Sequence, residues 1–255
     1  MPRFIGIHGK AGSGKTELAL IFTRLFGFKQ LAIASKIKEI AGRFFSVEKE
    51  DMYGSKKKDV RAILQGIGTS LKHPIETIDA ITFEGSKPLY PEWVYSHAMD
   101  YFGVPPEVIR SRIKFIQCIL SGIYSMHIDK EIHDMSINYG SNIWVEYLLG
   151  KTVMSTYDDC VYVISDVRLK DEFDRCIDLD SKMVKVIREG LKPKADDHFT
   201  ETDLDLVTGW DYIITNYKVN NWKSLMITKT ANIVRDLHSI GFFTENDTDK
   251  FKITL

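Results

Sequence analysis

The sequence predicts an α/β fold in three layers, with a mainly parallel central sheet and helices on both faces. Three observations predict it. The N-terminal region reads as a strand, a glycine-rich turn and a helix. The C-terminal third carries three short apolar runs, which are typical of strands buried on both faces of a parallel sheet. Segments with helical periodicity separate or follow these runs, as in alternating βα units.

The start of the chain alternates strand and helix. Residues 3–8 form a short apolar run that predicts a strand, and residues 15–26 repeat apolar side chains at helical spacing. The predicted buried face of this helix consists of Leu18, Ile21, Phe22 and Leu25. We expect Gly27 to end the helix, residues 30–33 to form a short strand, and residues 35–45 to form the next helix.

The remaining elements follow the same two periodicities. Helices are predicted at about 59–72, 105–123, 142–156, 170–176 and 222–237, and strands at 160–165, 183–187 and 212–215. Glycines and prolines punctuate residues 73–104, which therefore read as loop with short helices. We predict a single domain over residues 1–255, with a mostly helical insertion at about 73–141.

Composition narrows the class of protein. The 255 residues are 44% apolar and 27% charged, which argues against a disordered chain, a fibre and a membrane protein. The net charge of -1 argues against general nucleic-acid binding, but it leaves room for a local basic pocket that holds a small anion. Three cysteines without C-x-x-C spacing predict neither a disulfide framework nor a structural zinc site. No run reaches the roughly 20 apolar residues that cross a bilayer, so we expect no membrane partner.

The glycine-rich turn matches the phosphate-binding template G-x-x-x-x-G-K-[ST], the P-loop, at every fixed position. It consists of Gly9, Lys10, Ala11, Gly12, Ser13, Gly14, Lys15 and Thr16. Glycines let main-chain N–H groups surround a phosphate, and the start of the following helix adds a favourable dipole. Lys15 would reach the β- and γ-phosphates of a nucleotide, and Thr16 would offer its hydroxyl to Mg²⁺. The alternative, a glycine-rich turn of purely structural role, would seldom have the correct strand before it and helix after it.

A P-loop needs an acid that helps to retain the metal ion. Asp166 directly follows the apolar run at 160–165, at the kind of strand end where ligands gather in open α/β sheets. We predict Asp166 as a metal-binding and catalytic residue, and Lys15 as a second catalytic residue. Arg168, two residues later, could neutralise charge during phosphoryl transfer. The alternative for Asp166 is a solvated strand end whose carboxylate caps the next helix.

Seven further segments match the pattern of one family in the same order along the chain. They are Ala34–Glu39, Val60–Thr69 (R-x-x-L-Q-x-x-G-T), Trp144–Val145, Val163–Arg168 with the downstream Glu172, Val186–Gly190, His198–Glu201 (H-x-[ST]-E) and Asp211–Asn216. From about residue 5 to residue 225 the chain resembles the deoxynucleoside monophosphate kinases of tailed bacteriophages, a branch of the P-loop kinases. Lys36 and Glu189 stand where the family usually has proline. Residues 73–141, with a rival Trp-Val pair at 93–94, depart from its pattern.

The resemblance implies a P-loop kinase that uses ATP and Mg²⁺ to phosphorylate a deoxynucleoside monophosphate on its 5′-phosphate. The products would be ADP and a deoxynucleoside diphosphate, for the supply of DNA precursors. Donor binding would extend to Arg188, and the substrate would be bound by Lys38, Arg61, Gln65, Thr69, Arg168, His198 and Glu201. Positioning and charge stabilisation provide most of the catalysis in this chemistry, so no strong general base is needed. A cytoplasmic enzyme is implied, in the host cytoplasm if the protein is viral.

These residues also have plain structural interpretations. Arg61 and Gln65 could form a solvated helix face, Lys38 could be a surface lysine, and the element at 198–201 could brace a loop. The basic stretch before that element suggests a lid over the donor nucleotide at about 188–205, although charge runs between strands are usually just solvated.

Alternatives to the proposed activity also stay open. The chain could be another small-molecule P-loop kinase, acting on a nucleoside or on dephospho-coenzyme A, or a non-catalytic nucleotide-binding switch or assembly factor. Residues 73–141 could form a homodimer interface, recognise a second partner or be a passive structural insertion. Composition does not separate these three.

Overall fold

The structure, a computed structural model, describes residues 2–45, 47–53, 58–70, 130–155, 160–191, 202–217 and 219–242. Two compact units make up the chain: the sheet unit, Met1–Ile33 with Leu148–Leu255, and the helical unit, Ala34–Tyr147. The loop expected at 73–104 and the helix expected at 105–123 lie outside the described residues. The single domain over 1–255 stays a prediction.

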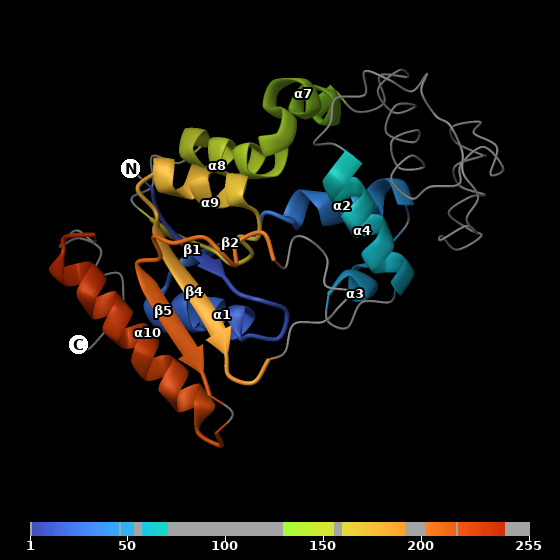
Figure 1. Ribbon diagram of the computed structural model, residues 1–255. Coiled ribbons are helices and arrows are strands. Elements are labelled where there is room, and N and C mark those ends of the chain that lie inside the picture. Colours follow the sequence, from blue (N-terminus) through green and yellow to red (C-terminus); the bar gives the residue numbers. More distant parts are fainter. Residues whose placement is uncertain are drawn as a thin grey trace. The chain divides into compact units, whose positions relative to one another are not determined.

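The sheet unit is built on five parallel strands in the order β2-β3-β1-β4-β5 (Figure 1). The strands are β1 (Arg3–His8), β2 (Lys29–Leu31), β3 (Val161–Ile164), β4 (Lys182–Arg188) and β5 (Tyr212–Asn216). Each lies where the apolar runs predict a strand, although β2 is shorter than expected and begins one residue earlier. The predicted α/β fold with a parallel sheet is therefore confirmed.

Helices cover both faces of this sheet. The helices are α1 (Lys15–Phe26), α9 (Lys170–Asp178) and α10 (Trp222–Ser239), and α8 (Ile143–Ser155) crosses the boundary between the two units. Figure 1 shows α1 and α10 on one side of the sheet and α9 on the other. In agreement, α1 packs on α10, β1, β2 and β3, while α9 packs on β1 and β4, which gives the three expected layers.

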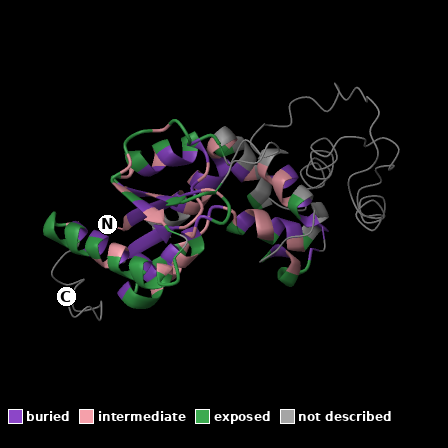
Figure 2. Cartoon of the chain, turned by 60° about the horizontal axis from the view of Figure 1, so that its bottom comes forward, coloured by how far each residue is buried: buried purple, intermediate pink, exposed green. Residues whose placement is uncertain are grey.

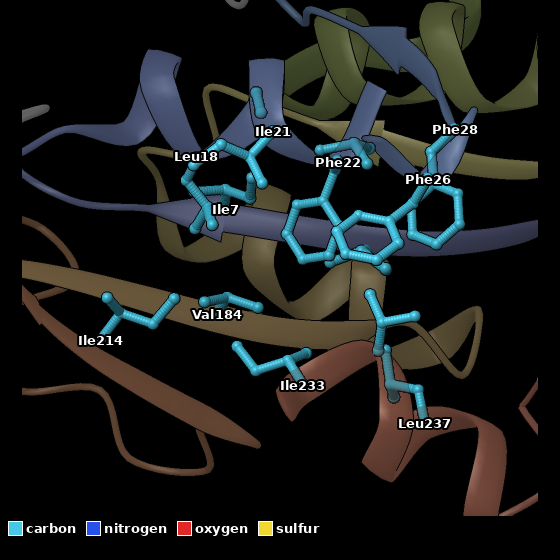
Figure 3. Close-up of a cluster of buried hydrophobic side chains, with 14 of the residues drawn as sticks. Ile7, Leu18, Ile21, Phe22, Phe26, Phe28, Val184, Ile214, Ile233 and Leu237 are labelled. Carbon is cyan, nitrogen blue, oxygen red and sulfur yellow. The ribbon is translucent and has the colours of Figure 1, made fainter. Parts of the chain in front are cut away.

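The main core lies between the sheet and the pair α1 and α10. Because side chains alternate along a strand, Ile5 and Ile7 of β1 enter this core while Phe4 and His8 face the other layer. Figure 3 shows core side chains from the sheet, α1 and α10, among them Ile7, Leu18, Phe22, Val184, Ile214, Ile233 and Leu237.

One residue of the predicted core is exposed. Leu25, expected on the buried face of α1, has 45% of its surface exposed, so that expectation was wrong. Phe22 and Phe28 stack with ring centroids 5.5 Å apart, and Phe26 lies beside them. These rings fill the core at the end of α1 and leave Leu25 outside it. Gly27 ends the helix as predicted, with φ +71° and its N–H bonded to Phe22 O.

Burial follows the same layers. In Figure 2 the central strands are buried, whereas the outer surface of α10 is exposed. None of the helices in the described ranges is both long and apolar enough to span a membrane.

The helical unit contains α2 (Ser35–Phe45), α3 (Lys49–Met52), α4 (Lys58–Ser70), α7 (Lys130–Tyr139), the short 3₁₀ helix η3 (Gly140–Asn142) and the first residues of α8. Helices α2 and α4 pack together and bury Ile40 and Ile63. Trp144, from the Trp-Val pair of the resemblance, donates its indole N–H to Gly68 O at 2.8 Å. This bond occupies a carbonyl in the last turn of α4, where carbonyls have no partner within the helix.

Candidate active site

The glycine-rich loop and three polar residues lie at the carboxyl ends of four neighbouring strands. Gly9 follows β1, Asp166 comes two residues after the end of β3, and β4 and β5 end in Arg188 and Asn216. Because all strands are parallel, their carboxyl ends lie along one edge of the sheet. That edge is the usual ligand site of open α/β sheets.

The backbone of the P-loop requires glycine at several positions. Gly12 has φ +77° and Gly14 has φ +109°, conformations that side-chain-bearing residues rarely adopt. Gly9 has a different reason: a Cβ there would lie 2.5 Å from Val186 O of β4. The loop therefore passes directly against the backbone of the neighbouring strand, and only glycine fits.

Lys15, the first residue of α1, keeps its ammonium inside the loop. Its side chain is buried, and Nζ donates hydrogen bonds to Gly9 O and, at 3.0 Å, to Lys10 O. The side chain therefore curls back over the turn that precedes its own helix. A cation held in this way, next to exposed main-chain N–H groups, favours an anion such as a phosphate.

Side chains from β4 and β5 hold two further carbonyls of the loop. Arg188 donates from Nη1 to Gly12 O at 2.9 Å, and Asn216 donates from Nδ2 to Ser13 O at 2.9 Å. The structure thus brings Arg188, predicted to bind the donor nucleotide, to the P-loop. Asn216 was part of the resemblance but had no assigned role. Its position at the end of a predicted strand was the signal that could have identified it.

Lys10 of the P-loop forms an ion pair with Asp205 at 2.8 Å. Both side chains are partly exposed, so the pair is held weakly. Asp203 anchors the same segment by accepting a hydrogen bond from Lys170 N at 2.7 Å. The described ends of the predicted lid, 188–191 and 202–205, are therefore both attached to the P-loop. The lid itself stays a prediction, and its predicted substrate residues His198 and Glu201 lie outside the described residues.

Asp166 is half-buried and its Oδ1 accepts a hydrogen bond from Ile33 N at 2.7 Å. It is not the N-cap of the next helix, because α9 has Leu169 at that position. The carboxylate of Glu172 binds Arg168 N at 2.8 Å and Leu169 N at 3.0 Å. The helix-capping alternative for Asp166 is thus wrong, and the buried Glu172 fixes the turn that carries Arg168.

The oxygen ligands predicted for a metal suit magnesium. The described residues hold no group of three or more His, Cys, Asp or Glu side chains placed to bind a metal ion. A hydroxyl from Thr16 and a carboxylate from Asp166 are hard oxygen donors. Mg²⁺ typically takes one or two protein carboxylates and completes its shell with water and phosphate oxygens. The residues therefore fit Mg²⁺ that arrives with a nucleotide.

His8, the last residue of β1, is buried directly before the P-loop. Its Nδ1 is 2.9 Å from Val167 O, and its ring stacks on Trp210 at 5.3 Å. Burial lowers the pKa of His8 to about 4, and the positive charges of Lys15 and Lys185 add to this shift. The imidazole is therefore neutral at physiological pH and adds no charge beneath the loop. The sequence analysis did not identify this residue.

The predicted acceptor residues belong to the helical unit. Lys38 on α2 has its ammonium 3.9 Å from the ring centroid of Tyr53, which is an exposed aromatic residue. On α4, Arg61 is exposed and Gln65 is half-buried. Thr69 also lies on α4, but its side chain is outside the described part of the chain.

Lys36, which stands where the family usually has proline, is buried in the helical unit. Its Nζ donates to Glu39 at 2.7 Å and to Glu131 of α7 at 2.8 Å, and Tyr147 donates its hydroxyl to the same Glu131 at 2.6 Å. Burial alone would lower the pKa of Lys36, but the hydrogen bonds to the two carboxylates outweigh it and raise the pKa above its usual range. This network ties α2 to α7 and α8.

Comparisons with known proteins agree with the resemblance. Residues 133–224 match the family model described as deoxynucleotide monophosphate kinase. The chain is also 25% identical over 214 residues to a protein of Acanthamoeba polyphaga mimivirus named "Putative deoxynucleotide monophosphate kinase". That alignment covers 84% of this chain and 88% of the relative. The predicted resemblance is confirmed, and both comparisons support a phosphotransferase.

Proposed function

We propose that the protein is a deoxynucleoside monophosphate kinase, which transfers the γ-phosphoryl group of ATP to the 5′-phosphate of its substrate with Mg²⁺. The observation that carries the proposal is the buried Lys15 ammonium within a glycine loop at the carboxyl ends of parallel strands. The matched family and the viral relative support the acceptor class. The product would enter the supply of DNA precursors.

The sheet unit would bind the donor. Main-chain N–H groups of the P-loop and the Lys15 ammonium would hold the phosphate chain, and Arg188 would add a second cation beside Gly12. Thr16 and Asp166 would hold Mg²⁺, which neutralises charge on the phosphates. In a site of this kind the protein positions charged groups before the reaction instead of moving them during it.

The helical unit would supply acceptor contacts, assigned on the resemblance. A nucleoside monophosphate carries nearly two negative charges at neutral pH, so its binding needs fixed cations. Lys38 and Arg61 would provide them, and Gln65 and Thr69 would bind the base or the sugar. His198 and Glu201 would complete the substrate contacts.

The transfer needs no strong base on the protein. An oxygen of the acceptor 5′-phosphate forms a bond to the γ-phosphorus while the bond from that phosphorus to the β–γ bridging oxygen breaks, and ADP leaves. The attacking oxygen is already largely deprotonated at neutral pH. Arg168, whose turn Glu172 fixes through main-chain hydrogen bonds, would stabilise the charge on the transferred group.

A panel of acceptors tests the proposal. The purified protein is incubated with ATP and Mg²⁺ and each of the four common deoxynucleoside monophosphates, their ribose counterparts, a nucleoside and dephospho-coenzyme A. We expect ADP and a deoxynucleoside diphosphate to form in equal amounts. Phosphorylation of only a nucleoside or dephospho-coenzyme A would contradict the proposed acceptor. Tight ATP binding without turnover on any acceptor would favour a nucleotide-binding switch.

A further inference from the structure

The P-loop carbonyls are held by groups that lie around the loop. Lys15 binds Gly9 O and Lys10 O, Arg188 binds Gly12 O, and Leu18 N binds Gly14 O at 3.0 Å. Asn216 binds Ser13 O. A loop that binds an anion must turn its N–H groups toward the ligand and its carbonyl oxygens away from it, since those oxygens carry partial negative charge.

We propose that Asn216 is a positioning residue for the phosphate chain, which acts through the peptide group between Ser13 and Gly14. This inference rests on the proposed function of the P-loop. In a trans peptide the C=O and the following N–H point in opposite directions. By holding Ser13 O toward β5, Asn216 turns the N–H of Gly14 away from β5, where it can donate to a phosphate oxygen.

The state of the Gly14 N–H agrees with this role. Within the described residues it has no hydrogen-bond acceptor, whereas Ser13 N donates to Lys10 O at 3.0 Å. An N–H group at the start of a helix without a protein partner is a ready donor to an anion. Gly14 also occupies φ +109°, a conformation that glycine adopts without strain, so the peptide group can keep this orientation.

Asn216 is itself held in place. It pairs with Arg188 across β4 and β5, and its main-chain O accepts a hydrogen bond from Glu189 N at 3.0 Å. The side chain lies tight against the loop, because a Cβ on Gly14 would be 2.9 Å from Asn216 Nδ2. Since the acceptor on the loop is a carbonyl, only a side chain with an N–H or O–H donor can make this contact.

The test distinguishes an effect of Asn216 on binding of the phosphate chain from an effect on binding of the base or the sugar. Binding of tripolyphosphate, ADP and ATP, each with Mg²⁺, is measured by titration calorimetry for the wild type and for Asn216→Ala. Loss of this partly buried hydrogen bond is expected to weaken binding of all three ligands by the same factor, about 5- to 20-fold. The KM for the acceptor and the thermal midpoint should stay close to those of the wild type. Asn232→Ala, on the exposed surface of α10, is the matched control.

Two results would overturn the inference. One is unchanged tripolyphosphate affinity in Asn216→Ala. The other is weaker ATP binding with normal tripolyphosphate binding, which would mean that Asn216 contacts the base or the sugar. If the alanine variant does not fold, Asn216→Asp keeps the size of the side chain but removes the donor. It should weaken tripolyphosphate at least as strongly, because its carboxylate also repels the ligand.

Failure of the proposed function would be visible separately. The inference alone fails if the wild type phosphorylates a deoxynucleoside monophosphate and the Asn216 variants bind tripolyphosphate normally. The proposed function alone fails if tripolyphosphate binding depends on Asn216 but no deoxynucleoside monophosphate is phosphorylated. As a spectroscopic check, the Gly14 amide proton should shift on addition of tripolyphosphate in the wild type and shift less in Asn216→Ala.

Discussion

The two units of the protein hold their polar side chains in different ways. At the ligand edge of the sheet unit, most polar side chains bind main-chain atoms, as Lys15, Asp166, Glu172, Arg188 and Asn216 do. In the helical unit, the described polar contacts are mostly between side chains, such as the network of Lys36, Glu39, Glu131 and Tyr147.

This difference affects how each unit tolerates amino-acid substitutions. A main-chain partner is present whatever the neighbouring side chains are, so one residue at a strand end suffices to make the contact. A side-chain network needs all its members together. We therefore expect substitutions at the sheet edge to act locally on phosphate binding, and substitutions in the helical network to act on the stability of that unit.

The largest effect is expected for Lys15→Met. The substitution removes the cation inside the P-loop but keeps a side chain of similar length, so the fold should persist. Phosphoryl transfer should fall by about 100- to 1,000-fold or more, the usual cost of losing a group that stabilises transition-state charge. Steady-state kinetics measure this loss, with circular dichroism to verify folding. Turnover equal to that of the wild type would contradict the role given to Lys15.

Gly9→Ala should destabilise the sheet unit through a steric clash, without any change of charge. The new Cβ would lie 2.5 Å from Val186 O, and backbone atoms of a central strand cannot move aside easily. We expect a loss of about 3 kcal/mol in the free energy of unfolding, measured by urea denaturation. Gly150→Ala on α8 is the control, because no described atom lies within 4 Å of its Cβ. It should be neutral or stabilise by up to about 1 kcal/mol. Equal effects of the two substitutions would show that the β4 contact imposes no constraint.

The sheet unit could be predicted well because its signals are local. The glycine turn, the apolar runs and the helical stripes each lie within a short segment, and parallel strands then bring Gly9, Asp166 and Arg188 to one edge without further information. Asn216 could have been found in the same way. Leu25 could not, because its exposure depends on Phe28, which lies beyond the end of its own helix.

A pH titration examines the neutral His8 beneath the P-loop. Its pKa is about 4 in the folded protein, below the usual 6.5. Between these values the unfolded chain binds a proton that the folded chain does not, so stability falls as the pH decreases. Urea denaturation at pH 7.5 and pH 4.5 should show about 2 kcal/mol of this loss in the wild type and not in His8→Asn.

The His8→Asn variant keeps a donor for Val167 O but cannot titrate, so other titrating groups are common to both proteins. His238→Gln, at an exposed position on α10, is the matched control for replacing a histidine outside the core. If wild type and His8→Asn lose the same stability on acidification, the histidine is not held neutral by burial.

The helical unit was harder to predict, for a physical reason. Lys36 and Glu131 are 95 positions apart, and nothing in the local sequence around either one specifies the other. The sequence showed only that Lys36 stands where the family usually has proline. Helix α7 lies in the segment at 73–141 that the sequence analysis predicted to depart from the family pattern, although the family model matches from residue 133 onward, so the resemblance gave no partner for Lys36.

The smallest effects on stability are expected for two lysine substitutions, one in this network and one in an ordinary surface ion pair. Lys36→Met leaves Glu131 without its cation, but Glu39 and Glu131 are partly exposed and water can solvate them. We therefore expect a loss of only about 1 kcal/mol in the free energy of unfolding. Lys170→Met, which breaks the exposed Lys170–Asp174 pair on α9, should cost less than about 0.5 kcal/mol.

Because the network joins α2 to α7, Lys36→Met should also raise the KM for the acceptor while the KM for ATP stays constant. A raised KM for ATP instead would mean that the helical network supports the donor site, and the functional division between the two units would not hold.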